Sequence, residues 1–238
     1  VDPLHNADIA RLFELMDHDR RGALAAALGE RLDGEVLAEM NDWVREALID
    51  ALDPHQVADL AVQLDTDDAV AIIEDMDDAD QRAVLRALPA DDRAAIEEAL
   101  SFPEDSAGRV MQRELVAVPE HWTVGQVIDY LRDSPELTSD FWEVFVVDPG
   151  HRPVGTMHLA WVLRTPRHIA VADVMQREQM LIPIDLDQEE VALRFQKYAL
   201  ISAAVIDPAG RLVGMITVDD IVHIIQEEAS EDVLRLSG

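Results

Sequence analysis

The chain of 238 residues contains no cysteine, few aromatic residues and few basic ones. Without cysteine, disulfides, thiolate metal sites and a cysteine nucleophile are all excluded. The 19 basic residues, among which Lys197 is the only lysine, face 49 acidic residues, and the formal net charge is −30. Such a chain is a poor partner for nucleic acid, because phosphates are bound through Lys and Arg, and for anionic membrane surfaces for the same reason.

Long apolar runs are also missing. A transmembrane helix needs about 20 mostly apolar residues, whereas the longest candidate, Ala199–Ile206, is far shorter. The start, Val1-Asp2-Pro3, lacks the basic and then apolar stretch of a signal peptide, and because it is not Met we expect a trimmed piece of a longer protein. Hydrophobic residues still make up 49% of the chain, enough for a sizeable core, and the length favours two domains.

Catalytic signatures are absent from the sequence. It holds no His-Glu-x-x-His zinc pattern, no Gly-x-Ser-x-Gly elbow and no P-loop. Carboxylates are so abundant that pairs of them carry no catalytic information, and we predict that the chain is not an enzyme. An acid excess of this size repels itself. Monovalent salt would screen it, and so would hard divalent cations such as Mg²⁺, Ca²⁺ or Mn²⁺, which prefer oxygen ligands.

A short repeat organises the first hundred residues, which are rich in good helix formers. An apolar residue recurs every twelve positions and is followed by a turn or helix-capping residue. The six positions are Met40, Leu52, Leu64, Met76, Leu88 and Leu100. This spacing predicts short helices that are marginal alone and bury their apolar faces by stacking into a superhelix.

The sequence pattern changes near Ser101-Phe102-Pro103, where segments typical of strands and of helices begin to alternate. Strands are expected at 115–118, 144–147, 154–157, 180–184, 203–206 and 212–216, with helices at 124–132 and 188–198. A longer repeat occupies this half. Asp148-Pro149-Gly150 recurs as Asp207-Pro208-Ala209, and Gly155 recurs as Gly214, both at an offset of 59. Each Asp-Pro-x-Gly or Asp-Pro-Gly element predicts a turn between two strands.

The repeated motifs resemble a CBS domain, and two copies resemble a CBS pair, or Bateman module. The stretch 103–111, the acidic run 187–192 and the tail 227–232 narrow the resemblance to the MgtE family of magnesium channels, whose N domain is similar to the short-helix superhelix. The implied fold is α plus α/β, with a superhelical N domain over 1–101, CBS domain 1 over 102–170 and CBS domain 2 over 171–228. Residues 229–238 would then lead toward a plug helix and a transmembrane pore domain that this chain lacks.

The resemblance implies a Mg²⁺-sensing portion on the cytoplasmic face of a membrane, dimeric through its CBS domains, in which Mg²⁺ bridges acids of the N domain and the CBS pair. The acids that match family positions are Asp67, Asp220, Asp187, Glu189, Glu228, Glu231 and Asp232. Each could instead be a helix-start acid or part of a solvated face. Where the family can carry further acids, this chain has Ala199 and His223. The tryptophans Trp122, Trp142 and Trp161 are candidates for CBS interfaces or for core packing.

Two other readings stay open. Many CBS pairs bind ATP or AMP through Gly-x-x-Thr-x-x-Asp, and Gly214, Thr217 and Asp220 keep that spacing, whereas the first copy has His158 and Trp161 at the polar positions. The nucleotide site of the first copy is therefore degraded. The third reading is a protein-interaction scaffold, because helical superhelices often bind partners.

Overall fold

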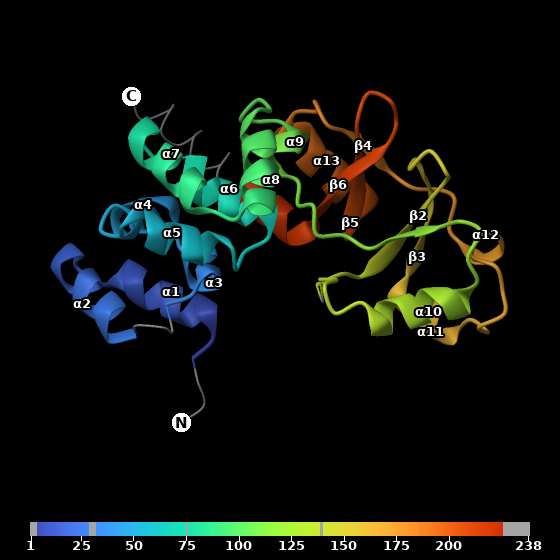
Figure 1. The fold of residues 1–238 in the computed structure, drawn as a ribbon, viewed down its shortest axis with the longest axis horizontal. Helices are drawn as coiled ribbons and strands as arrows, with labels where there is room; N and C mark the ends of the chain where they lie inside the picture. Colours follow the sequence, from blue (N-terminus) through green and yellow to red (C-terminus); the bar gives the residue numbers. More distant parts are fainter. Residues whose placement is uncertain (1–3, 29–31, 75, 139, 226–238) are drawn as a thin grey trace. The chain divides into compact units, whose positions relative to one another are not determined.

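A computed structural model describes residues 4–28, 32–74, 76–138 and 140–225 of the chain. The chain divides into two compact units, Val1–Ser101 and Phe102–Gly238. Regular structure in the described part of the first unit is helical (Figure 1). Its helices are α1 (Asn6–Leu15), α2 (His18–Leu28), α3 (Gly34–Ala38), α4 (Asp42–Ile49), α5 (Pro54–Ala61), α6 (Thr66–Glu74), α7 (Asp78–Ala87) and α8 (Ala90–Leu100).

The twelve-residue repeat coincides with the ends of these helices. Leu52 and Leu64 follow the last residues of α4 and α5 within three positions, and Leu88 is the C-cap of α7. After Met40, Leu52 and Met76 the next residue caps the following helix, whereas Pro89, after Leu88, makes no side-chain capping bond. Asn41 accepts a hydrogen bond from the Val44 amide at 3.2 Å. Asp53 and Asp77 make the same kind of contact at the starts of α5 and α7. Polar caps of this type satisfy amide groups that a short helix leaves unpaired.

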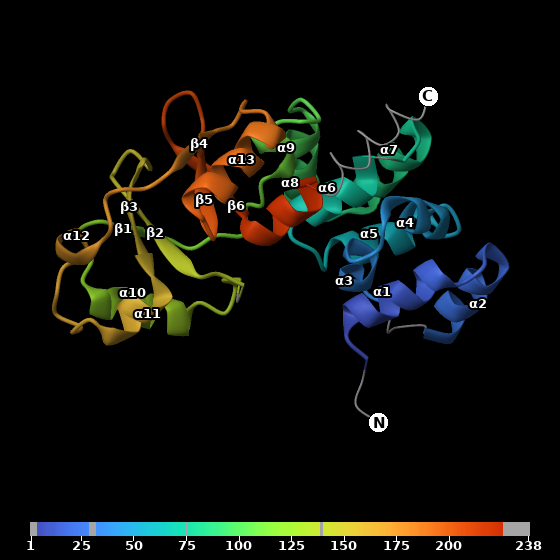
Figure 2. The ribbon, with the colours of Figure 1, turned by 180° about the vertical axis from the view of Figure 1, so that it is seen from behind.

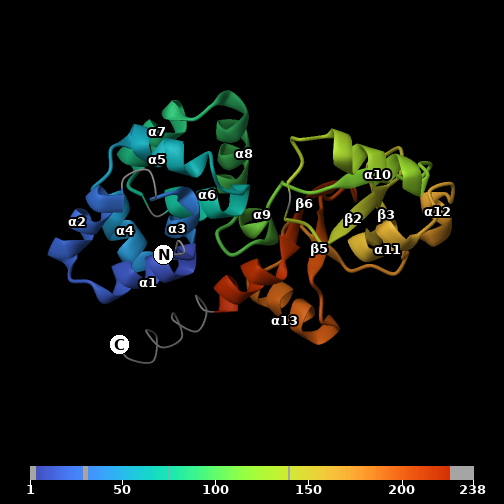
Figure 3. The ribbon, with the colours of Figure 1, turned by 90° about the horizontal axis from the view of Figure 1, so that it is seen from below.

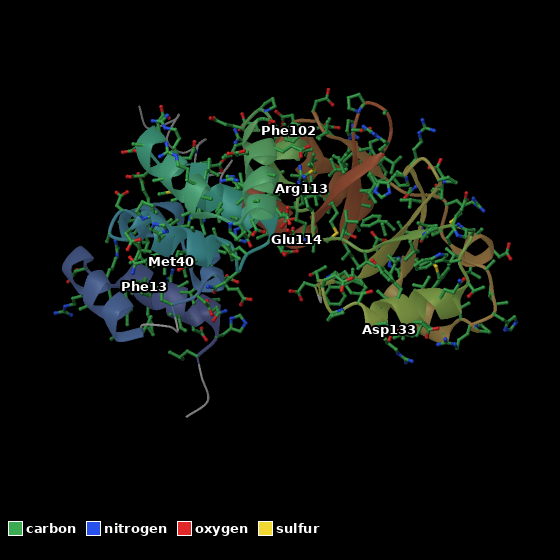
Figure 4. The ribbon with its side chains drawn as sticks, in the orientation of Figure 1. Phe13, Met40, Phe102, Arg113, Glu114 and Asp133 are labelled. Carbon is green, nitrogen blue, oxygen red and sulfur yellow. The ribbon has the colours of Figure 1, made fainter. Side chains whose placement is uncertain are left out.

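The core of the first unit forms between alternate helices. Helix α5 packs on α7, α6 on α8, and α1 on α3, which is the stacking expected of a superhelix in which no single helix buries its apolar face alone. Phe13 of α1 is fully buried, and Met40 is 3% exposed in the same core. Both are labelled in Figure 4.

The second unit contains two three-stranded sheets of identical topology. One is β1 (Ala117–Pro119), β2 (Glu143–Val147) and β3 (Pro153–His158), and the other is β4 (Leu181–Pro183), β5 (Ser202–Ile206) and β6 (Leu212–Thr217). In each sheet the first pair is parallel and the second antiparallel. The six predicted strands are all found, with ends displaced by at most two residues. Figure 2 shows the two sheets from behind.

Helices cover one side of each sheet. They are α9 (Ala107–Val110), α10 (Val124–Asp133), α11 (Leu159–Arg164), α12 (Val171–Val174) and α13 (Gln188–Tyr198), and residues 218–225 are also helical. Helices α10 and α11 pack side by side on the first sheet (Figure 3). Helices α10 and α13 occupy equivalent places, between the first and second strands of their sheets. The predicted helix 188–198 is observed without change.

Each sheet is completed by the segment that lies before the other sheet in the sequence. Met111, upstream of β1, is buried in the core around β4–β6, and the Gln112 and Met215 backbones pair there. Met175, upstream of β4, is buried in the core around β1–β3, next to the pairing of Thr156 with Gln176. Neither core is therefore built from one continuous stretch of chain, because the segments that close the two sheets are exchanged.

The two sheets meet through equivalent residues of the two copies. Phe145 and Ala204, which differ by the repeat offset of 59, share one buried cluster. The Ser202 hydroxyl donates to the Glu143 carboxylate at 2.5 Å, and this pair is also related by 59. The Leu212 amide donates to the His151 carbonyl at 2.9 Å. The offset read from the sequence is thus a pseudo-twofold relation between the copies.

The predicted class, a helical N domain followed by a CBS-type pair, is confirmed by this architecture. Among the described helices, none has the length and apolarity to cross a bilayer. Trp122 packs in the first α/β core, edge-on to Tyr130 with 5.5 Å between ring centroids. Trp142 and Trp161 are 66% and 53% exposed. Core packing therefore accounts for the first of the three tryptophans, and the other two lie on the surface.

Candidate functional site

The predicted acids that fall within the described residues all lie at the starts of helices. Asp67 is in the first turn of α6, Asp187 and Glu189 begin α13, and Asp220 lies in the first turn of the helix over 218–225. The amide groups at a helix start carry partial positive charge, which stabilises a carboxylate there. Glu228, Glu231 and Asp232 lie outside the described residues.

Asp220 belongs to a compact polar cluster at the end of β6. Its Oδ2 accepts hydrogen bonds from the Thr217 amide at 2.6 Å and the Thr217 hydroxyl at 2.9 Å. The same hydroxyl lies 2.6 Å from Asp219 Oδ1. Two carboxylates therefore converge on one hydroxyl, which has a single proton to donate. Asp219 was missed in the sequence analysis, although its place two residues after Thr217 would have indicated it.

The contact between Asp220 and the Thr217 amide is half of a capping box, so part of the work of Asp220 is structural. In the first copy the equivalent N-cap, His158, makes no side-chain capping bond. Trp161 stands where the second copy has Asp220, and its side chain is exposed. The two copies thus present different chemistry at the same backbone position, as the sequence comparison predicted.

Asp187 is the N-cap of α13, and its Oδ1 accepts from the Glu189 amide at 2.9 Å. The equivalent cap of α10 is Thr123, which accepts from the Gln126 amide at 3.3 Å and forms a full capping box. A neutral hydroxyl therefore does in the first copy what a carboxylate does in the second. Glu189 and its neighbour Glu190 are further acids in the first turn of α13, whereas the first turn of α10 has none. The acidity of this helix start exceeds what capping requires.

In the first unit, the backbone amides at a helix start lower the pKa of a carboxyl group. The pKa of Asp77 lies below its usual value, because the backbone amides of Asp80 and Ala79 donate to it. Asp67 is half-buried one helix earlier in the same repeat. At the two departures from the family pattern, Ala199 ends α13 in the left-handed conformation with φ 50° and His223 is exposed.

The donor chemistry suits a hard cation, although the described residues do not build a complete cage. No group of three or more His, Asp or Glu side chains within the described ranges is placed to hold a metal ion. Mg²⁺ does not need such a group, since it keeps several waters and binds through one or two carboxylates. The Asp219–Asp220 pair and the start of α13 supply oxygen ligands of that kind. These carboxylates fit a weakly bound ion that keeps most of its water ligands.

The fold and these acids define a class, namely a helical domain joined to a CBS pair with acidic helix starts. Residues 4–105 match the family model described as the MgtE intracellular N domain, and residues 171–227 match the CBS domain model. The first part of the chain is therefore similar to the MgtE intracellular N domain and the last part to a CBS domain, as the sequence resemblance implied.

Two curated relatives are magnesium transporters named MgtE. The protein from Thermus thermophilus is 35% identical over 146 residues, 61% of this chain and 32% of the relative. The protein from Bacillus subtilis is 25% identical over 232 residues, 98% of this chain and 51% of the relative. The chain therefore spans about half, or less, of the length of these relatives.

Two solved structures share the fold over nearly the whole chain. The cytosolic domain of the Mg²⁺ channel MgtE in complex with ATP superposes with a TM-score of 0.85 at 27% identity, covering 94% of this chain and 91% of that chain. The soluble part of a magnesium transporter superposes with a TM-score of 0.82 at 24% identity, covering 95% and 89%.

Proposed function

We propose that this chain is the Mg²⁺-sensing, non-catalytic regulatory portion of a magnesium channel or transporter on the cytoplasmic face of the membrane. The observation that carries the proposal is the difference between the two CBS copies. The second copy places Asp187, Glu189, Asp219 and Asp220 at positions where the first copy has neutral residues on the same sheet topology. Since the backbone also forms with neutral residues there, the charge of these acids is available to bind a regulatory cation in addition to capping their helices.

Repulsion between carboxylates supplies the switch. Two carboxylates about 4 Å apart repel by about 4 kcal/mol at an effective dielectric constant near 20. A divalent ion between them turns this penalty into attraction. The proposed bridge joins Asp67 of the N domain to Asp220 of the CBS pair, and Asp187, Glu189, Glu228, Glu231 and Asp232 are proposed to form further weak sites. Differential binding of Mg²⁺ to the closed arrangement then shifts the population toward it.

X-ray scattering with and without millimolar Mg²⁺ tests this switch. Mg²⁺ should lower the radius of gyration, because it removes the repulsion that holds the acidic domains apart. Asp67→Asn and Asp220→Asn should each weaken the compaction. Asparagine keeps an acceptor oxygen for the helix start but loses the charge.

The matched control is Asp92→Asn, which removes a first-turn acid of α8 that is not part of the proposed bridge. It should leave the Mg²⁺ response intact. A radius of gyration that does not change with Mg²⁺ would refute the switch. Equal loss of response in all three variants would show that only total charge matters.

The proposed partners are the transmembrane pore domain of the same protein and a second copy of the chain. Apolar side chains are exposed at equivalent places in both CBS copies. Trp142 and Ile201 precede the second strands of their sheets, and Leu163 and Val222 lie on the helices after the third strands. A face that repeats itself in this way suits a twofold, self-complementary interface. Sedimentation analysis should find a dimer, and Leu163→Glu with Val222→Glu should give a monomer.

Adenine-nucleotide sensing is the second candidate. It is favoured by the Thr217–Asp220 geometry in the second copy and by the ATP complex of the 27% identical MgtE cytosolic domain. Calorimetry with ATP alone and with Mg²⁺ alone separates the two candidates. Heat with ATP and none with Mg²⁺ would replace the magnesium proposal by the nucleotide one. Because Asp220 serves both, Asp220→Asn should weaken whichever ligand binds.

A further inference from the structure

The segment that leaves the N domain is hydrogen-bonded into the second CBS domain. The Ala107 amide donates to the Leu186 carbonyl at 2.7 Å, and the Gly108 amide to the Ile184 carbonyl at 2.8 Å. In the opposite direction, the Gln188 amide donates to the Asp105 carbonyl at 2.7 Å. Residues 105–108 therefore run alongside the loop 184–188 that begins α13. They are called the linker strand below because Ser106 forms a β-bridge with Asp187, although Ala107 and Gly108 are the first residues of α9.

Side-chain packing fixes the linker strand in place. Ala107 is fully buried in the core around β4–β6, where Phe102 also packs (labelled in Figure 4). A Cβ atom on Gly108 would lie 2.8 Å from Ile184 Cγ1 and 2.8 Å from Phe102 Cγ. This close approach requires glycine. The linker strand is thus a part of the second CBS core and not a free tether.

The linker strand also accepts a hydrogen bond from the first amide of α13. Gln188 is the first residue of that helix, and its amide is one of those that a helix leaves without an internal partner. The Asp105 carbonyl accepts it, while Asp187, one position earlier, pairs with Ser106 through a backbone bridge. The acidic helix start and the linker strand consequently form one hydrogen-bonded unit.

The first CBS copy holds the same arrangement with a different origin. There the Val171 amide donates to the Trp122 carbonyl, and the Val124 amide donates to the Ile169 carbonyl. We call each of these two hydrogen-bonded arrangements a clamp. Both parts of the first-copy clamp come from within the CBS pair. The linker strand instead follows the last N-domain helix, which ends at Leu100, by a few residues. Only the clamp on the second copy is tied by the chain to the N domain.

We infer that the linker strand couples the N domain to the cation state of the second CBS domain. The inference rests on the proposed Mg²⁺ sensing and adds the contacts through which ion binding at α13 reaches the N domain. A change at Asp187 or Glu189 shifts the start of α13, and the Gln188–Asp105 and Ala107–Leu186 hydrogen bonds pass that shift to the chain that leaves the N domain. The first copy has no such route.

Amide hydrogen exchange on the whole chain, with and without millimolar Mg²⁺, tests the coupling. Mg²⁺ should slow exchange at Ala107, Gly108 and Gln188 by about fivefold or more, the range of ordinary coupling between sites. Exchange at Val171 and Val124, in the clamp of the first copy, should stay unchanged. Compaction by scattering without a change at the linker strand would overturn this inference alone. The absence of both responses would overturn the proposed function as well.

A pair of matched variants breaks the route. Gly108→Val forces the linker strand away from Ile184 and should reduce the Mg²⁺-dependent compaction. Ala172→Val, at the equivalent position of the other clamp, should leave the compaction intact. Should Gly108→Val fail to fold, Ser106→Ala removes the bond from the Ser106 hydroxyl to the Pro103 carbonyl, 2.7 Å long, and should reduce the coupling more mildly. Full compaction in a folded linker-strand variant would refute the route.

Discussion

The two CBS copies share a backbone and differ in their chemistry. Both have a parallel and an antiparallel strand pair with a register shift at the same place, and both are closed by a segment borrowed from before the other sheet. They diverge where helices begin. The first copy has His158 and Trp161 at the positions of Thr217 and Asp220 in the second copy.

The difference separates what folding demands from what a binding site adds. A feature present in both copies, such as the glycine at 155 and 214 or the aspartate at 148 and 207, is explained by a contact that both folds make. A feature present in one copy alone, such as the negative charge at the start of α13, is not needed for the shared backbone, because the neutral Thr123 caps α10. One chain thus provides its own control, and variants made at matched positions of the two copies test which residues serve the fold.

The largest effect is expected from the shared glycines. A Cβ on Gly214 would lie 2.9 Å from the Gln112 carbonyl oxygen, and one on Gly155 would lie 2.9 Å from the Gln176 carbonyl oxygen. A backbone carbonyl group cannot move aside to relieve such a contact in the way that the end of a flexible side chain can. Gly155→Val and Gly214→Val should each lower the free energy of unfolding by about 3 kcal/mol, at the upper end for overpacking. Urea denaturation measures it.

Gly22→Val is the control for these two variants. Nothing lies within 4 Å of a Cβ at this helical position, and the change in stability should stay below about 1 kcal/mol. If one of the two sheet glycines tolerated valine, the exchanged segments would not be equivalent in the two copies, and the pseudo-twofold relation would be wrong at that point.

These exchanged segments mark where sequence reasoning ended. The strand pattern and the twelve-residue repeat follow from local chemistry, namely alternation, caps and turns, and they predicted nearly every element. The repeat of Arg109-Val110-Met111 as Asp173-Val174-Met175 was visible too. Which sheet each segment closes depends on tertiary contacts, such as the pairing of Gln112 with Met215. A local pattern carries no information on that choice.

The places of the candidate acids at helix starts were predictable, and their side-chain contacts only partly so. Helix-start acids stand out from spacing, and Asp187 and Asp220 were found at such starts. Their companions were harder to see. The convergence of Asp219 and Asp220 on the Thr217 hydroxyl depends on rotamers, which one sequence does not fix. The pairing of the two acids across domains stays a proposal.

The next effect comes from transplanting one helix start onto the other. The double variant Thr217→His with Asp220→Trp gives the second copy the polar positions of the first. It should cost about 1 kcal/mol through loss of the capping bond between Asp220 and the Thr217 amide. In calorimetry it should abolish a nucleotide response and weaken the Mg²⁺ response, because Asp187 and Glu189 remain. The reverse variant, His158→Thr with Trp161→Asp, should gain some stability by capping α11. A ligand response that the first transplant leaves unchanged would separate the site from this helix start.

A smaller effect distinguishes the two hairpin arginines. Arg152 Nε donates across the sheet–sheet interface to the Ala209 carbonyl at 3.2 Å, whereas Arg211 folds back onto Asp207 at 2.7 Å. Arg152→Ala should therefore lower stability by about 1 kcal/mol and speed exchange of the Leu212 amide, which crosses the same interface. Arg211→Ala should leave that amide protected. Equal exchange in both variants would mean that the Arg152 contact does not hold the copies together.

The smallest effect is a pH dependence that again differs between the copies. The pKa of Asp207 lies below its usual value, chiefly because the Arg211 amide donates to it and then because of the Arg211 guanidinium. The pKa of Asp129 in the first copy is also lowered, but chiefly by the side-chain hydrogen bond from Arg167. A lowered folded-state pKa contributes stability that is present above the unfolded value, about 3.9, and is lost as the pH falls through the folded value.

Asp207→Asn and Asp129→Asn should each flatten the fall in urea midpoint on acidification below about pH 4, since the carboxyl group that takes up the proton is gone. Salt then separates the causes. High salt screens an exposed ion pair but not a backbone amide bond, so the contribution of Asp129 should shrink in about 1 M NaCl while that of Asp207 should largely persist. If both contributions vanish in salt, the Asp207 turn is held by its arginine and not by the backbone.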